Sequence, residues 1–145
     1  MSERVRVFLD TSVLIAASDM DHARHAESRV LLAVASKENC ACGAHSLAES
    51  YANLSIVRGG GTRRPATALR LVEQIASRMM VVALEPDEYL EAIRDAAGLR
   101  ISGGTIYDAL LVKCALKVDA ERIYTWNERH LRLVAPELAG RIVRP

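Results

Sequence analysis

Short apolar runs alternate along this chain with longer segments in which apolar residues recur every three or four positions. The short runs predict strands at 5–9, 40–44, 79–84, 122–126 and 141–143. The helical spacing predicts a helix directly after Asp10 and further helices at 21–37, 46–57, 65–77, 87–99 and 103–117. Strands that alternate with helices of roughly 10–15 residues are typical of βαβ units. The pattern therefore predicts an α/β fold with a central parallel sheet of about five strands, covered by helices on both faces.

Two of these elements also carry predictions about burial. In the helix at 21–37, the apolar positions at helical spacing are expected to face the core; they are Ala23, Ala26, Val30, Ala33 and Val34. The continuous apolar run at 79–84 predicts a strand that is buried on both faces, as in the middle of a parallel sheet.

Length and composition narrow the class of protein. A chain of 145 residues suits one domain, which we assign to residues 1–145. Half of the residues are hydrophobic and 26% are charged, which argues against a disordered or coiled-coil chain. The formal net charge is +1, so recognition of a polyanion would have to rest on a local group of basic residues.

The cysteines and the longest apolar runs exclude further classes. The three cysteines, Cys40, Cys42 and Cys114, are odd in number and form no C-x-x-C pair, which disfavours a disulfide framework or a zinc ribbon. The apolar runs at 30–35 and 79–84 are far shorter than the roughly 20 residues of a membrane helix. We therefore expect a cytoplasmic protein without a membrane partner.

Polar residues follow the predicted strands at positions that should meet at one edge of the sheet. Asp10 ends the first strand, Glu49 lies in the first turns after the second, Asp108 lies early in the helix at 103–117, and Asn127 follows the strand at 122–126. Ligands of open parallel sheets bind outside the carboxyl ends of the strands. The order therefore predicts a site built from three carboxylates and a carboxamide.

Each of these residues also has a structural explanation. Asp10 could serve only as a helix N-cap, and acidic residues near a helix start, such as Glu49 and Asp108, are favoured by the helix dipole. Yet no Lys or Arg lies within one helical turn of Glu49 or Asp108; the nearest is Lys113. Clustered carboxylates without cationic partners repel one another, and a hard divalent cation relieves that repulsion.

The ordered set of motifs resembles the PIN-domain ribonucleases, and most of all the VapC-type toxins of bacterial toxin–antitoxin pairs. The segments that carry the resemblance are Val7-Phe8-Leu9-Asp10-Thr11-Ser12, Ser46-Leu47-Ala48-Glu49, Thr105-Ile106-Tyr107-Asp108 and Tyr124-Thr125-Trp126-Asn127. The resemblance implies a three-layer αβα sandwich, a Mg²⁺ or Mn²⁺ ion and endoribonuclease activity. It also implies a cognate antitoxin protein and a homodimer.

By position, the resemblance assigns roles to individual residues. Asp10, Glu49 and Asp108 match the acidic metal ligands of the family, and Thr11, Ser12 and Thr125 match supporting hydroxyls near the substrate. Asn127 stands where many members carry a fourth acid, which bears on a second metal ion more than on the first.

Basic residues around the triple glycine are the candidates for RNA binding. Arg58, Arg63 and Arg64 flank Gly59–Gly61, where a solvated loop is the alternative explanation. The four histidines, His22, His25, His45 and His130, are expected to be surface or helix-packing residues, and Trp126 is expected to pack in the core.

The sequence thus favours a metal-dependent endoribonuclease, the toxin of a toxin–antitoxin pair, with Asp10, Glu49, Asp108 and Asn127 at its catalytic centre. The alternative is a non-catalytic PIN-like module that binds RNA or another protein. The presence of three of the usual four acidic residues favours the enzyme.

Overall fold

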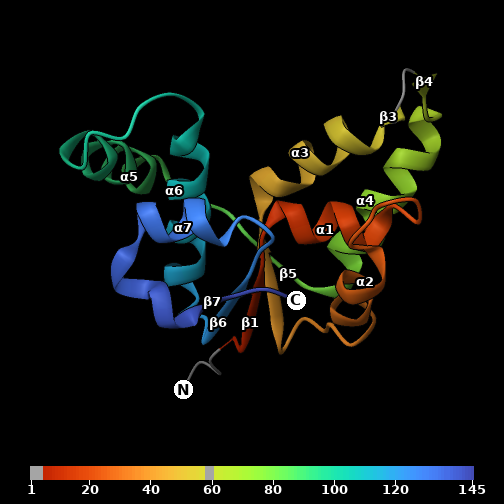
Figure 1. Ribbon diagram of the computed structural model, residues 1–145, viewed down its shortest axis with the longest axis horizontal. Coiled ribbons are helices and arrows are strands. Elements are labelled where there is room, and N and C mark those ends of the chain that lie inside the picture. The colour runs from red at the N-terminus through yellow and green to blue at the C-terminus, as the bar shows by residue number, and fades with distance from the viewer. Residues whose placement is uncertain (1–4, 58–60) are drawn as a thin grey trace.

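A five-stranded sheet forms the middle layer of the molecule (Figure 1). The computed structural model describes residues 5–57 and 61–145. The strand order is β5-β2-β1-β6-β7, and every neighbouring pair is parallel. The strands are β1 (Val7–Leu9), β2 (Cys40–Gly43), β5 (Met80–Val82), β6 (Arg122–Tyr124) and β7 (Ile142–Val143). The predicted parallel sheet is confirmed.

Helices cover both faces of this sheet. On one side, shown at the right of Figure 1, lie α1 (Thr11–Ser18), α2 (His25–Ala33), α3 (Ala44–Leu54) and α4 (Pro65–Arg78). On the other side lie α5 (Pro86–Gly98), α6 (Ile106–Lys117) and α7 (Glu128–Val134), with the short 3₁₀ helices η1 (Gly103–Thr105) and η2 (Pro136–Arg141). The arrangement is the expected three-layer αβα sandwich.

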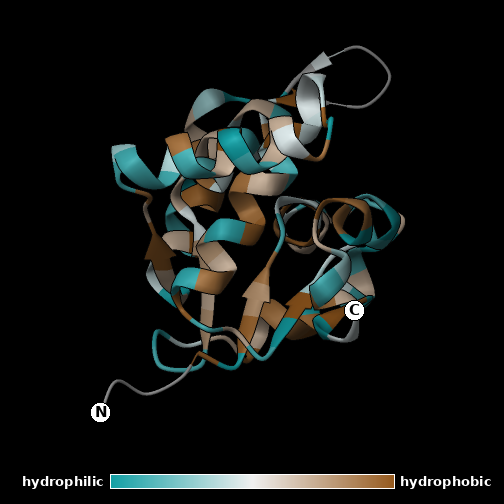
Figure 2. Cartoon of the chain, turned by 90° about the vertical axis from the view of Figure 1, so that its left-hand side faces the viewer, coloured by the Kyte–Doolittle hydropathy of each residue, from teal (hydrophilic) through white to brown (hydrophobic). Residues whose placement is uncertain are grey.

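The core consists of two apolar clusters, one on each face of the sheet. Successive residues of β1 point to opposite faces, so Phe8 packs with Leu111 and Ile123 in one cluster. Leu9 packs with Val13 and Ile75 in the other. In Figure 2, the strands carry mostly hydrophobic colours, and the helices around them alternate between hydrophobic and hydrophilic colours.

The segment between α3 and α4 differs from the predicted loop. A small antiparallel pair, β3 (Ile56–Val57) and β4 (Gly61–Thr62), extends from the end of α3. Arg58, Gly59 and Gly60 lie outside the described residues. Of the glycine-flanking arginines, only Arg63 and Arg64 are therefore placed by the structure.

The burial prediction for the second helix is wrong. Val30 and Val34 are 63% and 68% exposed, whereas Ser28 is buried and Leu31 and Leu32 pack against the core. The inward face carries Leu31 and Leu32, which pack against the core, and Ser28, whose Oγ accepts the indole Nε1–H of Trp126 at 2.8 Å. These partners lie far away in the sequence, so helical spacing alone could not choose between the two faces.

The burial prediction for the strand at 79–84 is also wrong. The strand is the shorter β5, in which Met80 and Val81 are 40% and 36% exposed and only Val82 is buried. β5 pairs with β2 alone and lies at the edge of the sheet. An apolar run shows that a strand can be buried, but strand order decides whether its faces are covered. Among residues 5–57 and 61–145, no helix is both long enough and apolar enough to span a membrane.

Candidate functional site

Asp10 lies at the carboxyl edge of the sheet, directly after β1. The β1–β6 register pairs Leu9 with Tyr124, so Asp10 comes beside Thr125, and the Asp10 N–H donates to the Tyr124 carbonyl at 3.0 Å. The Asp10 side chain is buried, and it forms no hydrogen bond to the backbone of α1 although it holds the N-cap position. Helix capping therefore does not explain this carboxylate.

Two hydroxyls hold one oxygen of the Asp10 carboxylate. Thr125 Oγ1–H donates to Asp10 Oδ2 at 2.6 Å, and Ser12 Oγ–H donates to the same oxygen at 2.7 Å. Each hydroxyl in turn accepts a backbone N–H from the segment after β6, from Trp126 at Ser12 and from Asn127 at Thr125. The network fixes the carboxylate and gives Oδ1 no hydrogen bond from the described part of the chain.

Thr11 has a different partner from the other two predicted hydroxyls. It is buried, and its Oγ1–H donates to Ser46 Oγ at 2.8 Å. This bond connects the start of α1 to the first turns of α3, the helix that carries Glu49.

Glu49 on α3 and Asp108 on α6 reach the same edge of the sheet. Burial raises the pKa of Glu49, and the charges of Asp10 and Asp108 raise it further. Burial also raises the pKa of Asp108, with a further contribution from Asp10, while His130 acts in the opposite direction. The three predicted carboxylates are therefore close enough to interact electrostatically. Among the described residues, no Lys or Arg forms an ion pair with any of them.

His45 is a site residue that the sequence interpretation missed. Its Nε2 lies 3.6 Å from Glu49 Oε1 and is buried without a hydrogen-bond partner among the described residues. Burial lowers the pKa of this imidazole, although the Asp10 charge opposes the effect, so a neutral ring is favoured. The signal available in the sequence was the i, i+4 spacing of His45 and Glu49 on one helix.

Gly43 makes room for the His45 ring. A Cβ at position 43 would lie 2.9 Å from His45 Cε1 and 3.1 Å from Nδ1, both shorter than ordinary contacts. The end of β2 is thus shaped so that the imidazole lies against the backbone, beside Glu49.

The two predicted arginines that the structure describes, Arg63 and Arg64, form no ion pair with the three carboxylates. Arg63 forms an ion pair with Asp19, at the end of α1, with an N–O distance of 3.5 Å. Arg64 is exposed at the start of α4. Arg58 lies outside the described residues, so its predicted role stays a prediction.

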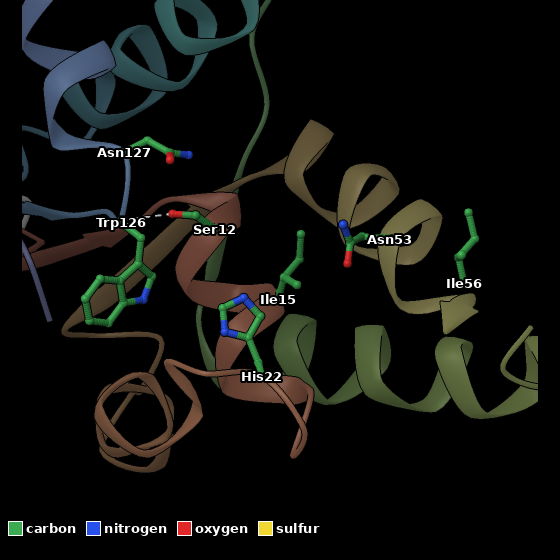
Figure 3. A pocket seen from close by; sticks show the side chains of 7 residues that line it. All are labelled: Ser12, Ile15, His22, Asn53, Ile56, Trp126 and Asn127. Atoms are coloured by element: carbon green, nitrogen blue, oxygen red, sulfur yellow. Dashed lines mark hydrogen bonds between the residues drawn. The ribbon is translucent and has the colours of Figure 1, made fainter. Parts of the chain in front are cut away.

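Asn127 lines a cavity together with Ser12, the residue that donates to Asp10 (Figure 3). The cavity has a volume of about 510 Å³ and lies between α1, the end of α3 and the segment after β6. Its lining residues are Ser12, Ile15, His22, Asn53, Ile56, Trp126 and Asn127. Ser12 connects the cavity to the acidic edge, because it lines the cavity and also donates to Asp10 Oδ2.

The carboxylate oxygens of Asp10, Glu49 and Asp108 are ligands of the kind that a hard divalent cation prefers, although these side chains are not closely grouped. Within residues 5–57 and 61–145, no three His, Cys, Asp or Glu side chains are grouped closely enough to hold a metal ion. The carboxylates nonetheless offer oxygen ligands without Lys or Arg partners among the described residues. Burial is the main cause of the raised pKa values of Glu49 and Asp108, and the Asp10 charge adds to both. The half-exposed Glu49 side chain has the freedom to close such a site.

A family model and a curated relative both match most of this sequence. The family model of the PIN domain matches residues 7–135, a range that includes all four predicted site residues. Ribonuclease VapC27 of Mycobacterium tuberculosis (strain ATCC 25618 / H37Rv) is 32% identical over 113 residues, which cover 78% of this chain and 79% of that protein.

Solved structures agree at the level of the fold. Mycobacterium tuberculosis VapC20, a sarcin-ricin loop cleaving toxin, matches with a TM-score of 0.71 at 20% identity, over 96% of this chain and 99% of the other. The DNA-bound VapBC of Salmonella typhimurium matches with a TM-score of 0.66 at 18% identity, over 97% of this chain and 98% of the other.

Proposed function

Because this chain belongs to the PIN-domain family, we propose that it is an endoribonuclease that hydrolyses phosphodiester bonds in RNA. The observation that carries the proposal is the acidic edge of the sheet. There a buried carboxylate, Asp10, is fixed by two hydroxyls and interacts with Glu49 and Asp108, with no Lys or Arg paired to them in the described chain. Such a cluster costs stability unless it serves a cation.

The proposal includes a Mg²⁺ or Mn²⁺ ion held by Asp10, Glu49 and Asp108. When bound, such an ion would neutralise charge on a phosphate and lower the pKa of a water molecule bound to it. Other residues of the site orient these carboxylates and the groups around them. Ser12 and Thr125 tie down Asp10 Oδ2, which leaves Oδ1 as the free ligand oxygen. The uncharged Asn127 side chain can orient water or substrate but adds no charge for a second ion.

We also propose that the protein is the toxin of a toxin–antitoxin pair. The relative that is 32% identical is itself named as a ribonuclease of the VapC type, and the Salmonella structure is a VapBC complex. We propose, as the sequence already suggested, that the protein binds a cognate antitoxin protein. We also propose that it acts in the cytoplasm and forms a homodimer.

The decisive experiment compares Asp10→Asn with the wild type in an RNA cleavage assay with Mg²⁺. We expect the variant to lose activity by orders of magnitude and to remain folded, because an Asn side chain still accepts a hydrogen bond from Ser12 or Thr125. EDTA should abolish wild-type activity. Asp95→Asn, an exposed change on α5, is the matched control and should cleave normally.

Two results would contradict the proposal. Full activity of Asp10→Asn, or of the wild type in EDTA, would exclude a mechanism that depends on these carboxylates. A wild-type protein that binds RNA but never cleaves it would favour the alternative, a non-catalytic module that binds RNA or a protein partner.

A further inference from the structure

The cavity beside Asp10 has walls that suit a flat, uncharged, heteroaromatic group. Ile15 and Ile56 supply aliphatic surface, and Trp126 supplies the side of an indole (Figure 3). The indole N–H is already bonded to Ser28, so Trp126 offers the cavity apolar surface and no donor. Its volume of about 510 Å³ falls within the roughly 300–1,000 Å³ range of small-ligand sites.

Two carboxamides, Asn53 and Asn127, line the cavity. The side chains of Asn53 and Asn127 form no hydrogen bond within the described residues, and each offers one acceptor and two donor hydrogens. His22 Nδ1 accepts the backbone N–H of Arg24 at 3.0 Å. No carboxylate is among the described residues that line the cavity.

Positive charge lies next to the cavity. The Arg24 guanidinium is 4.6 Å from the centre of the Trp126 ring, and that of Arg144 is 5.2 Å away. Arg144 is partly neutralised by Glu128, at 3.6 Å, whereas Arg24 forms no ion pair within the described residues. The cavity therefore combines neutral edge-reading groups with a basic flank, which complements a base attached to an anionic backbone.

We propose that this cavity binds an unpaired nucleobase of an RNA strand whose neighbouring phosphate lies at the Asp10 carboxylate. The inference rests on the proposed function. Ser12 provides the link, because it contacts Asp10 Oδ2 and also lines the cavity. Unpaired bases are recognised by apolar or aromatic faces together with hydrogen bonds at the base edge, and a carboxamide can pair with such an edge in bidentate fashion. Asn53 is the residue that selects the base.

The test measures binding of short single-stranded RNAs of one base type, oligo(A), oligo(U) and oligo(C), by fluorescence anisotropy with Ca²⁺ in place of Mg²⁺. Gel electrophoresis of the same samples shows that the RNAs stay intact. We expect the wild type to prefer one of them. Asn53→Leu should bind that RNA about tenfold more weakly and lose the preference. Gln74→Leu, the same chemical change on the exposed face of α4, is the matched control and should behave as the wild type.

A second readout locates the binding. Trp126 is the only tryptophan of the chain, so its indole N–H gives a single NMR signal at the cavity wall. This signal should shift when the preferred RNA is added, and the spectra of Asn53→Leu and the wild type without RNA show that both are folded.

Unchanged RNA affinity and base preference in Asn53→Leu would overturn the inference. So would an indole signal that does not move at saturating RNA. The inference also fails if Asn53→Leu weakens binding of a protein partner but not of RNA. The cleavage assay separates the two proposals. Cleavage by the wild type with no effect of Asn53→Leu removes the base site and retains the nuclease. Selective binding through Asn53 without cleavage retains the base site and removes the nuclease.

Discussion

His45 lies beside Glu49 at a distance from which it can orient the carboxylate. A buried Nε2 without a partner is costly, and its position 3.6 Å from Glu49 Oε1 is slightly too long for a hydrogen bond. A small inward movement of Glu49 would complete the bond and bring the carboxylate toward Asp10. His45 is thus placed to orient Glu49 rather than to contact the substrate.

This placement predicts the effect of His45→Phe, which keeps the ring and removes the donor. The half-activating Mg²⁺ concentration should rise roughly tenfold, because groups that orient metal ligands typically change affinity by that order. The maximal rate should change less. Calorimetric titration with Mn²⁺ gives the same comparison without RNA. His25→Phe on α2 is the control, and an unchanged midpoint in His45→Phe would show that Glu49 is held by other means.

The raised pKa values of Glu49 and Asp108 predict how stability depends on pH without metal. An acid whose pKa is higher in the folded than in the unfolded state destabilises the fold above its folded pKa, and this cost disappears as the pH falls toward the ordinary values of 4.5 and 3.8. The Tm of the metal-free protein should therefore gain a contribution from these groups as the pH is lowered from 7 toward 4.

The same groups provide the control. The Asp10 charge contributes to both raised pKa values, so Asp10→Asn should show a smaller gain in Tm than the wild type over this range. Asp95→Asn should match the wild type. Equal pH profiles of Asp10→Asn and the wild type would mean that the three carboxylates do not interact.

At the scale of elements, a hydrogen bond connects α2 to the segment after β6. Trp126 follows β6, and its indole reaches Ser28 on the buried face of α2. The contact joins a helix near the start of the chain to the strand end that carries Thr125 and Asn127. The rotation of α2 and the shape of the cavity wall therefore depend on the same side chain.

Ser28→Ala tests this connection. The substitution leaves a partly buried indole N–H without an acceptor, so the free energy of unfolding should fall by roughly 1–3 kcal/mol. Urea denaturation measures the change. Ser102→Ala is the control, because Ser102 is exposed and its side chain makes no capping hydrogen bond. Equal stability of Ser28→Ala and the wild type would show that water replaces the serine.

At the scale of the whole molecule, the three cysteines report on global unfolding. Cys40 and Cys42 on β2 and Cys114 on α6 are free thiols, all buried. Burial raises the pKa of Cys40 and Cys42 to about 12 and that of Cys114 to about 11, so each thiol stays protonated at neutral pH. They lie in the two apolar clusters on opposite faces of the sheet.

We therefore expect native protein to resist alkylation by iodoacetamide at neutral pH, and all three thiols to react together in denaturant. Mass spectrometry counts the modified residues over time. Because both clusters must open, the rate in native buffer should follow the rate or equilibrium of unfolding. Rapid modification of one thiol under native conditions would contradict this and would indicate local opening at that residue.

The sequence by itself determined the order of the elements, the parallel sheet and the positions of Asp10, Glu49, Asp108 and Asn127 at one edge. These features follow from local pattern, since parallel strands bring their carboxyl ends to the same side. The tertiary structure alone decided that β5 is an edge strand, that α2 turns Ser28 inward and that His45 lies against Glu49. The physical reason is that strand order, helix rotation and side-chain approach depend on residues far apart in the chain, which no local periodicity encodes.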